Sequence, residues 1–297
     1  MSWKEDNKTY QILRDAEAGG YGVVAAIAYN IEHIVAFVRA AEKKRSPIII
    51  QFFPWAITAT DGLLVRAAAE AAKHASVPIA VHLDHAQDEA LIRRAADTLP
   101  FDSIMVDMSH YDDEENLSKT KVLVDYCHAR HITTEAEPGR IEGGEDGVAD
   151  TADLEGVMTT AQQVDDFVAT GIDFLAPAFG NVHGEYGARG PILDYERLDM
   201  VREAVKAASQ KAGRGVRVVL HGTNDFPEDV MKKCIAGGVS KINVNKLVLD
   251  DYLVFQKNES AGLPSTTLVE RGISTTQKLV EWQMDVCGST GKAPAKA

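Results

Sequence analysis

Three histidines follow closely on apolar segments, where ionisable side chains are not expected without a reason. His85, His183 and His221 each come after a run of Val, Ile, Leu, Ala or Phe. Burying a charge is costly unless the group is paired or bound to a metal. Three imidazoles with an open fourth position are the usual ligands of a catalytic zinc ion, and the open position admits a substrate oxygen. The histidines therefore predict a zinc site, with the adjacent Asp84 as an acid or base.

Carboxylates and amides occupy comparable positions. Asp107 and Glu137 end two further apolar segments, and Asn243 and Asn245 lie in another. The two carboxylates are suited to orient the imidazoles or to form a second metal position. Taken singly, a histidine at such a place is more often structural, and Asp84 suits a helix cap. We interpret His82 as a neighbour of the site, and the other histidines as surface or packing residues: His33, His74, His110, His128 and His131.

Eight short apolar segments would position these side chains. They are rich in Val, Ile or Ala, as expected for strands that are buried on both faces of a parallel sheet. These predicted strands span residues 23–29, 48–53, 79–84, 103–108, 133–137, 174–179, 216–221 and 241–245.

Amphipathic segments alternate with the predicted strands, at residues 31–44, 61–74, 88–98, 116–131, 160–170, 195–212 and 227–236. Asp61 and Asp88 are expected N-caps, and Gly171 and Gly237 expected C-caps. Eight strand–helix repeats predict a closed (β/α)₈ (TIM) barrel, whose active site lies at the carboxyl ends of the strands. The alternative is an open doubly wound sheet, which would need a GxGxxG turn after its first strand; the sequence has none there.

We expect a single domain over residues 1–297, since barrels of this length are common. A helical extension is expected at about residues 264–290, followed by a disordered tail after Thr290. The glycine-rich connection between residues 138 and 160 is long, which is typical of functional or mobile loops.

The net charge of −13 argues against nucleic acid as a partner, because backbone phosphates need a basic face. A small phosphorylated substrate is still compatible with it, since a few Lys, Arg and backbone N–H groups can bind one phosphate locally. The three cysteines are far apart and form no CxxC motif, which argues against a disulfide framework. We find neither a signal peptide nor an apolar stretch long enough to span a membrane, so a cytoplasmic protein is expected.

Two turns have the composition of a phosphate site. HGTND at residues 221–225 and INVNK at residues 242–246 follow the seventh and eighth predicted strands. In a barrel the loops after these strands are the usual phosphate-binding place. Plain turns with a helix cap are the alternative.

These residues resemble the class II fructose-bisphosphate and tagatose-bisphosphate aldolases over nearly the whole chain. The most specific motif is VHLDH at residues 81–85. The others are SIMVDMSH (103–110), EAEPGRIEGGEDG (135–147), FGNVHGEY (179–186), LHGTND (220–225), KINVNK (241–246) and GSTGKA (288–293).

The resemblance implies that Asp84 is the catalytic acid/base and that His85, His183 and His221 bind zinc. It also implies a homodimer and leaves open a monovalent cation near the phosphate loop. The phosphate-bearing half of the substrate would be positioned by Gly184, Gly222, Thr223, Asn224, Asn243, Asn245 and Lys246.

Three carboxylates receive roles from the same resemblance. Asp107 and Glu137 match a second or alternative metal position. Glu145 matches a glutamate on a mobile loop that assists proton transfer. The implied reaction is reversible aldol cleavage of a phosphorylated ketose to dihydroxyacetone phosphate and an aldehyde.

Departures from the family pattern lie on the substrate side. Phe53, followed by Pro54 and Trp55, stands where the family has a serine that helps to hold one substrate phosphate. The family's GGS triplet reads Gly222–Thr223–Asn224 here, and Lys246 stands where the family has a threonine. Lys246 could restore phosphate binding through its charge, whereas Phe53 and Trp55 could close the pocket to a phosphate. Fructose 1,6-bisphosphate is thus the first candidate, with tagatose bisphosphate or a less phosphorylated ketose as alternatives.

Two other functions are considered. A zinc barrel hydrolase often carries an HxH pair on its first strand, and residues 23–29 contain no histidine. A non-catalytic descendant acting as a binding protein is disfavoured by the intact Asp84 and histidines. Schiff-base chemistry is not expected, because the only lysine we place at a strand end is Lys246, beyond the last strand. Cobalt or iron could replace zinc among three imidazoles.

Overall fold

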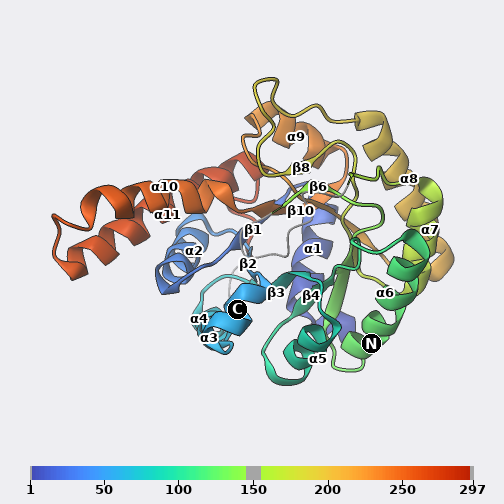
Figure 1. Cartoon of the computed structure of the whole chain (residues 1–297), viewed down its shortest axis with the longest axis horizontal. Helices are drawn as coiled ribbons and strands as arrows, with labels where there is room; N and C mark the ends of the chain where they lie inside the picture. The colour runs from blue at the N-terminus through green and yellow to red at the C-terminus, as the bar shows by residue number, and fades with distance from the viewer. Residues whose placement is uncertain (1, 145–154, 295–297) are drawn as a thin grey trace.

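Eight parallel strands close into a barrel in the computed structural model, which describes residues 2–144 and 155–294. The order around the barrel is β1-β10-β9-β7-β5-β4-β3-β2 (Figure 1). The predicted (β/α)₈ barrel and all eight predicted strands are confirmed. The strands are β1 (Val23–Ile27), β2 (Ile48–Phe52), β3 (Ile79–Ala86), β4 (Ser103–Val106), β5 (Thr133–Ala136), β7 (Phe174–Leu175), β9 (Arg217–Leu220) and β10 (Val239–Val244).

A second, two-stranded parallel sheet joins two connecting loops. It pairs β6 (Glu142–Gly143) with β8 (Val182–His183). Its register places Gly143 opposite His183, and a Cβ on Gly143 would lie 2.0 Å from the His183 carbonyl oxygen. Only glycine allows this approach, so Gly143 fixes the loop that carries one of the predicted zinc ligands.

Every residue of the eight barrel strands is buried, which explains their apolar sequences. Side chains that alternate toward the barrel interior form an apolar floor, with Val23 and Ala25 from β1, Ile49 from β2 and Ala80 from β3. The helix α1 (Lys8–Gly19) contributes further side chains to this floor: Ile12, Leu13 and Ala16. The sequence analysis did not predict α1, because its apolar residues are few.

The helices confirm the predicted alternation around the sheet (Figure 1). They are α2 (Ile31–Lys44), α3 (Pro54–Thr60), α4 (Leu63–His74), α5 (Glu89–Thr98), α6 (Asp113–His128), α7 (Ala161–Thr170), α8 (Tyr195–Ala212) and α9 (Glu228–Ala236). The predicted caps Asp88, Gly171 and Gly237 are confirmed. Asp61 as an N-cap is wrong: it ends the unforeseen α3 in a left-handed conformation, with φ 50°, and Gly62 precedes α4.

A hairpin of two helices projects from the barrel (Figure 1, orange to red). It consists of α10 (Lys246–Glu259) and α11 (Ser265–Cys287), and α11 also packs along α2. We call this hairpin the arm. In residues 2–144 and 155–294, every helix is too short or too polar to cross a membrane.

The chain end after Thr290 differs from the expectation. The Gly291 N–H donates to the Lys44 carbonyl oxygen, the Ala293 N–H donates to the Arg45 carbonyl oxygen, both at 2.9 Å, and Ala293 is buried. The predicted disorder is therefore wrong for residues 291–294, because backbone hydrogen bonds tie them to the end of α2. Residues 295–297 lie outside the described part.

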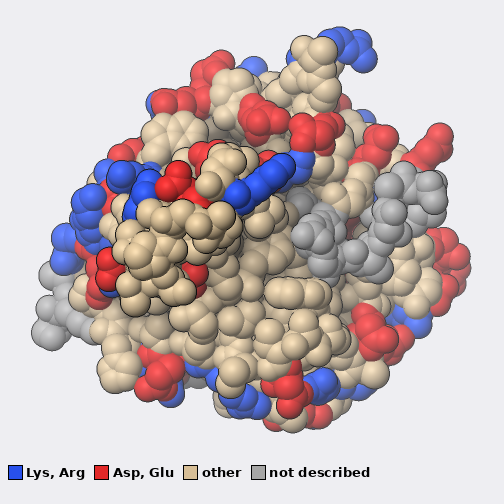
Figure 2. All heavy atoms as spheres, turned by 60° about the vertical axis from the view of Figure 1, so that its left-hand side comes forward, with Lys and Arg blue, Asp and Glu red and all other residues tan. Residues whose placement is uncertain are grey.

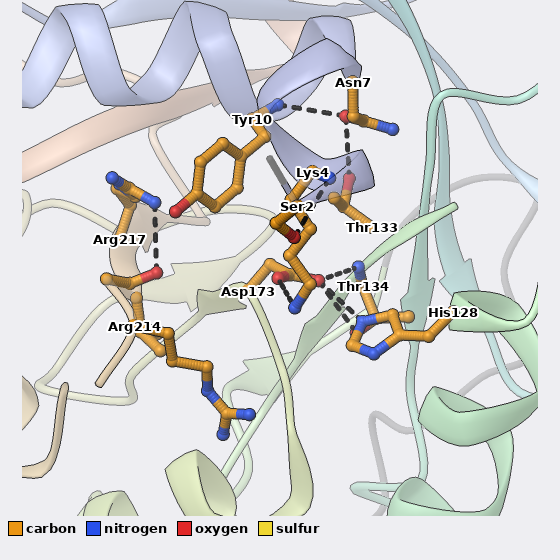
Figure 3. A network of polar contacts seen from close by, with 12 residues as sticks. Ser2, Lys4, Asn7, Tyr10, His128, Thr133, Thr134, Asp173, Arg214 and Arg217 are labelled. Carbon is orange, nitrogen blue, oxygen red and sulfur yellow. Dashed lines mark hydrogen bonds and ion pairs between the residues drawn. The ribbon is translucent and has the colours of Figure 1, made fainter. Parts of the chain in front are cut away.

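A polar network ties the N-terminus to the opposite end of the barrel from the predicted site (Figure 3). The buried Asp173 precedes β7, and its Oδ1 lies 2.5 Å from Lys4 Nζ. His128 Nε2 lies 2.8 Å from Asp173 Oδ2, which also accepts from the Thr134 N–H at 2.9 Å. Burial raises the pKa of Asp173, but the hydrogen bond with His128 and the charge of Lys4 outweigh it and lower that pKa. The network therefore stabilises the ionised carboxylate.

Asp173→Asn is expected to lower the free energy of unfolding at pH 7 by about 3 kcal/mol, because it leaves Lys4 without its buried partner. A carboxylate with a lowered folded-state pKa stabilises the fold above the unfolded-state pKa of about 4 and loses this effect as pH falls further. Denaturant titrations of wild type and variant should therefore converge in acid. Asp165→Asn, at an exposed carboxylate of α7, is the control. Equal midpoints for Asp173→Asn and wild type at pH 7 would refute the role of this network.

Candidate active site

The three predicted histidines meet at the carboxyl ends of the strands. His85 lies in β3, His183 in β8, and His221 directly follows β9. Their ligand nitrogens lie within 4.8 Å of one another, and all three side chains are buried. The ring centroid of His85 is 4.8 Å from those of both His183 and His221. Such convergence of three imidazoles is the arrangement that suits a tetrahedral metal ion with one open position.

Carboxylates hold the second nitrogens of two imidazoles. Asp107 Oδ2 lies 2.8 Å from His85 Nδ1, and Glu135 Oε1 lies 2.8 Å from His221 Nε2. If these nitrogens carry the protons, as their partners indicate, the lone pairs of His85 Nε2 and His221 Nδ1 face each other at 3.0 Å. Two lone pairs at this distance repel unless a proton or a metal ion lies between them. The donor set therefore fits a metal ion.

The backbone at His85 explains how two neighbouring residues reach the same site. Successive strand residues normally point to opposite faces. His85 has a left-handed φ of 45°, and the pairing of β3 with β4 shifts register between Leu83 and Ala86. Such an irregularity re-aims a side chain, at a cost of about 1–3 kcal/mol for a non-glycine residue. It lets both Asp84 and His85 line the same pocket.

The two carboxylate oxygens of Asp84 have different surroundings. Its Oδ2 accepts from Asn243 Nδ2 at 3.0 Å and from Gln51 Nε2 at 3.3 Å. Its Oδ1 is buried, has no hydrogen-bond partner among the described residues, and lies 3.7 Å from His82 Nε2. Burial raises the pKa of Asp84, but the charges of His85 and Lys241 more than offset this and hold that pKa well below its usual range. The side chain is thus held as an ionised hydrogen-bond acceptor.

A buried ion pair below the histidines was missed by the sequence analysis. Lys241 Nζ lies 2.8 Å from Glu135 Oε2 and donates to Asn243 Oδ1 at 2.9 Å, entirely inside the barrel. Burial raises the pKa of Glu135, but Lys241 and the hydrogen bond with His221 lower it to about 2. The period of two along β10 was the available signal, since it places residues 241, 243 and 245 on one face.

Negative charge accumulates around His85. Burial lowers the pKa of this imidazole, but the charge of Asp84 and the hydrogen bond with Asp107 raise it to about 10. Glu137 lies nearby and is buried. Among the described residues its Oε2 has no hydrogen-bond partner, and its Oε1 accepts from the Ile141 N–H at 2.7 Å. Burial and the charge of Asp107 raise the pKa of Glu137 to about 8. The surroundings therefore favour a cation at the histidines.

The predicted substrate residues surround the same place. Thr223 Oγ1 donates to the Asn243 carbonyl oxygen at 2.5 Å, and Asn224 Nδ2 donates to the Gly184 carbonyl oxygen at 3.2 Å. A Cβ on Gly222 would lie 2.3 Å from the Val182 carbonyl oxygen, so this position requires glycine. The pocket is lined by Ile27, Phe53, Asp84, His85, His183, Gly222, Thr223, Asn224, Asn243 and Asn245.

Two predicted residues lie differently. Lys246 lines an adjoining cavity of about 590 Å³ and forms an ion pair with Glu185. Glu145, the predicted mobile-loop glutamate, lies outside the described residues.

Comparisons with known proteins agree with this geometry. The family model described as fructose-bisphosphate aldolase class-II matches residues 7–292. A Coccidioides immitis (strain RS) protein, provisionally named a fructose-bisphosphate aldolase, is 53% identical over 296 residues, which are 97% of this chain and 96% of that protein.

Solved structures extend the comparison. A crystal structure of a Coccidioides immitis protein with the same provisional assignment matches with a TM-score of 0.93 at 53% identity, covering 97% of this chain and 98% of that one. The YdjI aldolase from Escherichia coli K12 matches with a TM-score of 0.79 at 28% identity, covering 96% and 98%. The family match over nearly the whole chain and the 53% identity together show that this chain belongs to the class II fructose-bisphosphate aldolase family.

Proposed function

We propose that this protein catalyses reversible, zinc-dependent aldol cleavage of a phosphorylated ketose, and that His85, His183 and His221 hold the ion. The observation that carries the proposal is the convergence of three buried imidazoles beside the buried, ionised carboxylate of Asp84. Zinc suits three imidazoles, and when bound it polarises a carbonyl group that occupies its open position.

Asp84 is the proposed base for cleavage. It accepts the proton of the substrate hydroxyl next to the carbon–carbon bond that breaks, which forms the aldehyde. The bonding electron pair stays on the ketone half as an enediolate, and Glu145 returns a proton to its carbon to give dihydroxyacetone phosphate. Condensation runs through the same steps in reverse. No oxidant or reductant is needed.

The phosphate-bearing half is proposed to lie against the turns after β9 and β10. Left-handed glycines and exposed N–H groups in such turns bind anions. The residues assigned to it are Gly184, Gly222, Thr223, Asn224, Asn243, Asn245 and Lys246. A monovalent cation near these turns is part of the proposal, and assays should include potassium and sodium.

Asp107 and Glu137 are proposed to serve the metal in different ways. Asp107 is engaged with His85, so its first role is to orient that imidazole. The unpartnered Oε2 of Glu137 fits an alternative ligand position for the ion.

We also propose a cytoplasmic homodimer of carbohydrate metabolism. The three cysteines are free and buried, in keeping with a reducing compartment. Exposed apolar side chains on the arm support self-association: Leu253, Val254 and Val269. Figure 2 brings the arm forward and shows charged side chains of both signs around uncharged surface.

The first assay compares cleavage of fructose 1,6-bisphosphate, tagatose 1,6-bisphosphate and fructose 1-phosphate by zinc-loaded protein. Asp84→Asn is expected to lower kcat by about 10²-fold or more, because the proton acceptor is lost. The variant should keep its zinc, measured by elemental analysis, and a strong chelator should abolish wild-type activity. Full activity in chelator, or in Asp84→Asn, would contradict the proposal.

Lys241→Met tests the buried ion pair. We expect a loss of about 3 kcal/mol in unfolding free energy, because Glu135 is left as an unpaired buried charge. Zinc affinity, measured by chelator competition, should fall about tenfold or more, because Glu135 orients His221. Lys232→Met, which breaks an exposed pair with Glu228, should cost less than about 1 kcal/mol. Unchanged zinc affinity in Lys241→Met would show that the ion pair does not contribute to metal binding.

Val254→Glu tests the arm as a dimer interface. Wild type should have the mass of a dimer in light scattering, and the variant should shift toward monomer, because a charge is costly in an apolar interface. Ile192→Glu, at an exposed position outside the arm, should leave the mass unchanged. A monomeric wild type would exclude the homodimer.

A further inference from the structure

The pocket beside the three histidines is polar on one side and apolar on the other. The residues that follow β9 and β10 line it with amides, a hydroxyl and glycine. The residues from β1 and β2 line it with hydrocarbon only, through Ile27 and Phe53. Asp84 and His85 come from β3, which neighbours β2 in the barrel. A substrate bound at the histidines therefore meets polar groups with one half and apolar groups with the other.

Phe53 and Ile27 form the apolar wall of the pocket. Phe53 directly follows β2, is buried, and shares the interior face of that strand with Ile49 and Gln51. Its ring centroid lies 6.2 Å from that of His85 and 6.4 Å from that of Tyr29. Neither Phe53 nor the buried Ile27 offers a hydrogen-bond donor. A phosphate placed here would lose its hydration without replacement, which is strongly unfavourable.

The charges around the pocket also disfavour a second phosphate. Among the described residues that line it there is neither lysine nor arginine. Lys246 lies in the adjoining cavity, pairs with Glu185, and shares this cavity with Asp225, Asp250 and Asp251. Among the described residues, the groups suited to bind a phosphate lie on the polar side of the pocket, after β9 and β10. They provide a site for one phosphate and not for two.

We propose that the substrate is a ketose 1-phosphate whose aldehyde-forming half is uncharged, and that Phe53 sets this specificity. The inference rests on the proposed aldolase function. Cleavage of the carbon–carbon bond would give dihydroxyacetone phosphate and an unphosphorylated hydroxyaldehyde. Asp84 takes the hydroxyl proton and the enediolate carbon gains one, so atoms and electrons balance. The C–H groups of the aldehyde half pack against the Phe53 ring.

The test uses the condensation reaction of the zinc-loaded full-length protein. Dihydroxyacetone phosphate is offered with D-glyceraldehyde or with D-glyceraldehyde 3-phosphate, and kcat/KM is measured for each aldehyde. Wild type should prefer D-glyceraldehyde by about tenfold or more, because the apolar wall rejects the phosphate. In cleavage, fructose 1-phosphate should correspondingly be preferred over fructose 1,6-bisphosphate.

Two variants of one position separate chemistry from size. Phe53→Ser removes the ring and supplies a hydroxyl, so the preference should fall about tenfold or reverse. Phe53→Leu keeps an apolar side chain, so the preference for D-glyceraldehyde should persist. Thermal unfolding and zinc content of both variants show whether the site is intact.

The outcomes are distinguishable. A wild-type preference for D-glyceraldehyde 3-phosphate, or an unchanged ratio in folded Phe53→Ser, overturns the inference and leaves the aldolase function standing. If neither aldehyde condenses although zinc is bound, the proposed function fails and the inference fails with it. If Phe53→Ser does not fold, the wild-type ratios in condensation and cleavage decide alone.

Discussion

The ion pair between Lys241 and Glu135 is the interaction on which the site depends. It lies inside the barrel, above an apolar floor to which α1 contributes and below the three histidines. Lys241 keeps Glu135 ionised, Glu135 fixes His221, and Asn243 joins Lys241 to Asp84. A carboxylate without Lys241 would be an isolated buried charge, which proteins avoid by protonation or rearrangement. One lysine therefore lets the barrel hold an ionised carboxylate beside the three histidines.

The strained backbone at His85 complements this charge arrangement. A regular strand would send Asp84 and His85 to opposite faces, and only one of the two side chains would reach the pocket. The left-handed residue and the register shift bring both into one pocket, and the fully buried β3 holds them there. The cost of about 1–3 kcal/mol is a substantial part of a net stability of about 5–15 kcal/mol, so the surrounding buried structure must hold His85 in this conformation. Local strain here places the carboxylate of Asp84 and the imidazole of His85 in the same pocket.

Most of the fold could be predicted from the sequence, because a fully buried parallel strand must be apolar and eight such segments alternate with helices. The helices α3 and α10 could not, since they immediately follow strands and have no strong pattern of their own; Asp61 was misassigned for this reason. The histidines were predictable because imidazoles at strand ends are unusual. The role of Lys241 was not predictable, because a period of two shows which face of the strand a side chain occupies but not which distant group it contacts. Its partner Glu135 is adjacent only after the barrel closes.

The site separates its chemistry from its specificity. Asp84, Glu135, His221 and Asn243 share hydrogen-bond partners, so replacing any one leaves another buried polar group unsatisfied. Phe53 makes ring contacts but no side-chain hydrogen bond in the described residues, so a change there leaves this network intact. A change at the ends of β1 and β2 can therefore alter the lining of the pocket without breaking this hydrogen-bond network. The geometry thus allows a chain to keep the motifs of its family while one wall of its pocket differs.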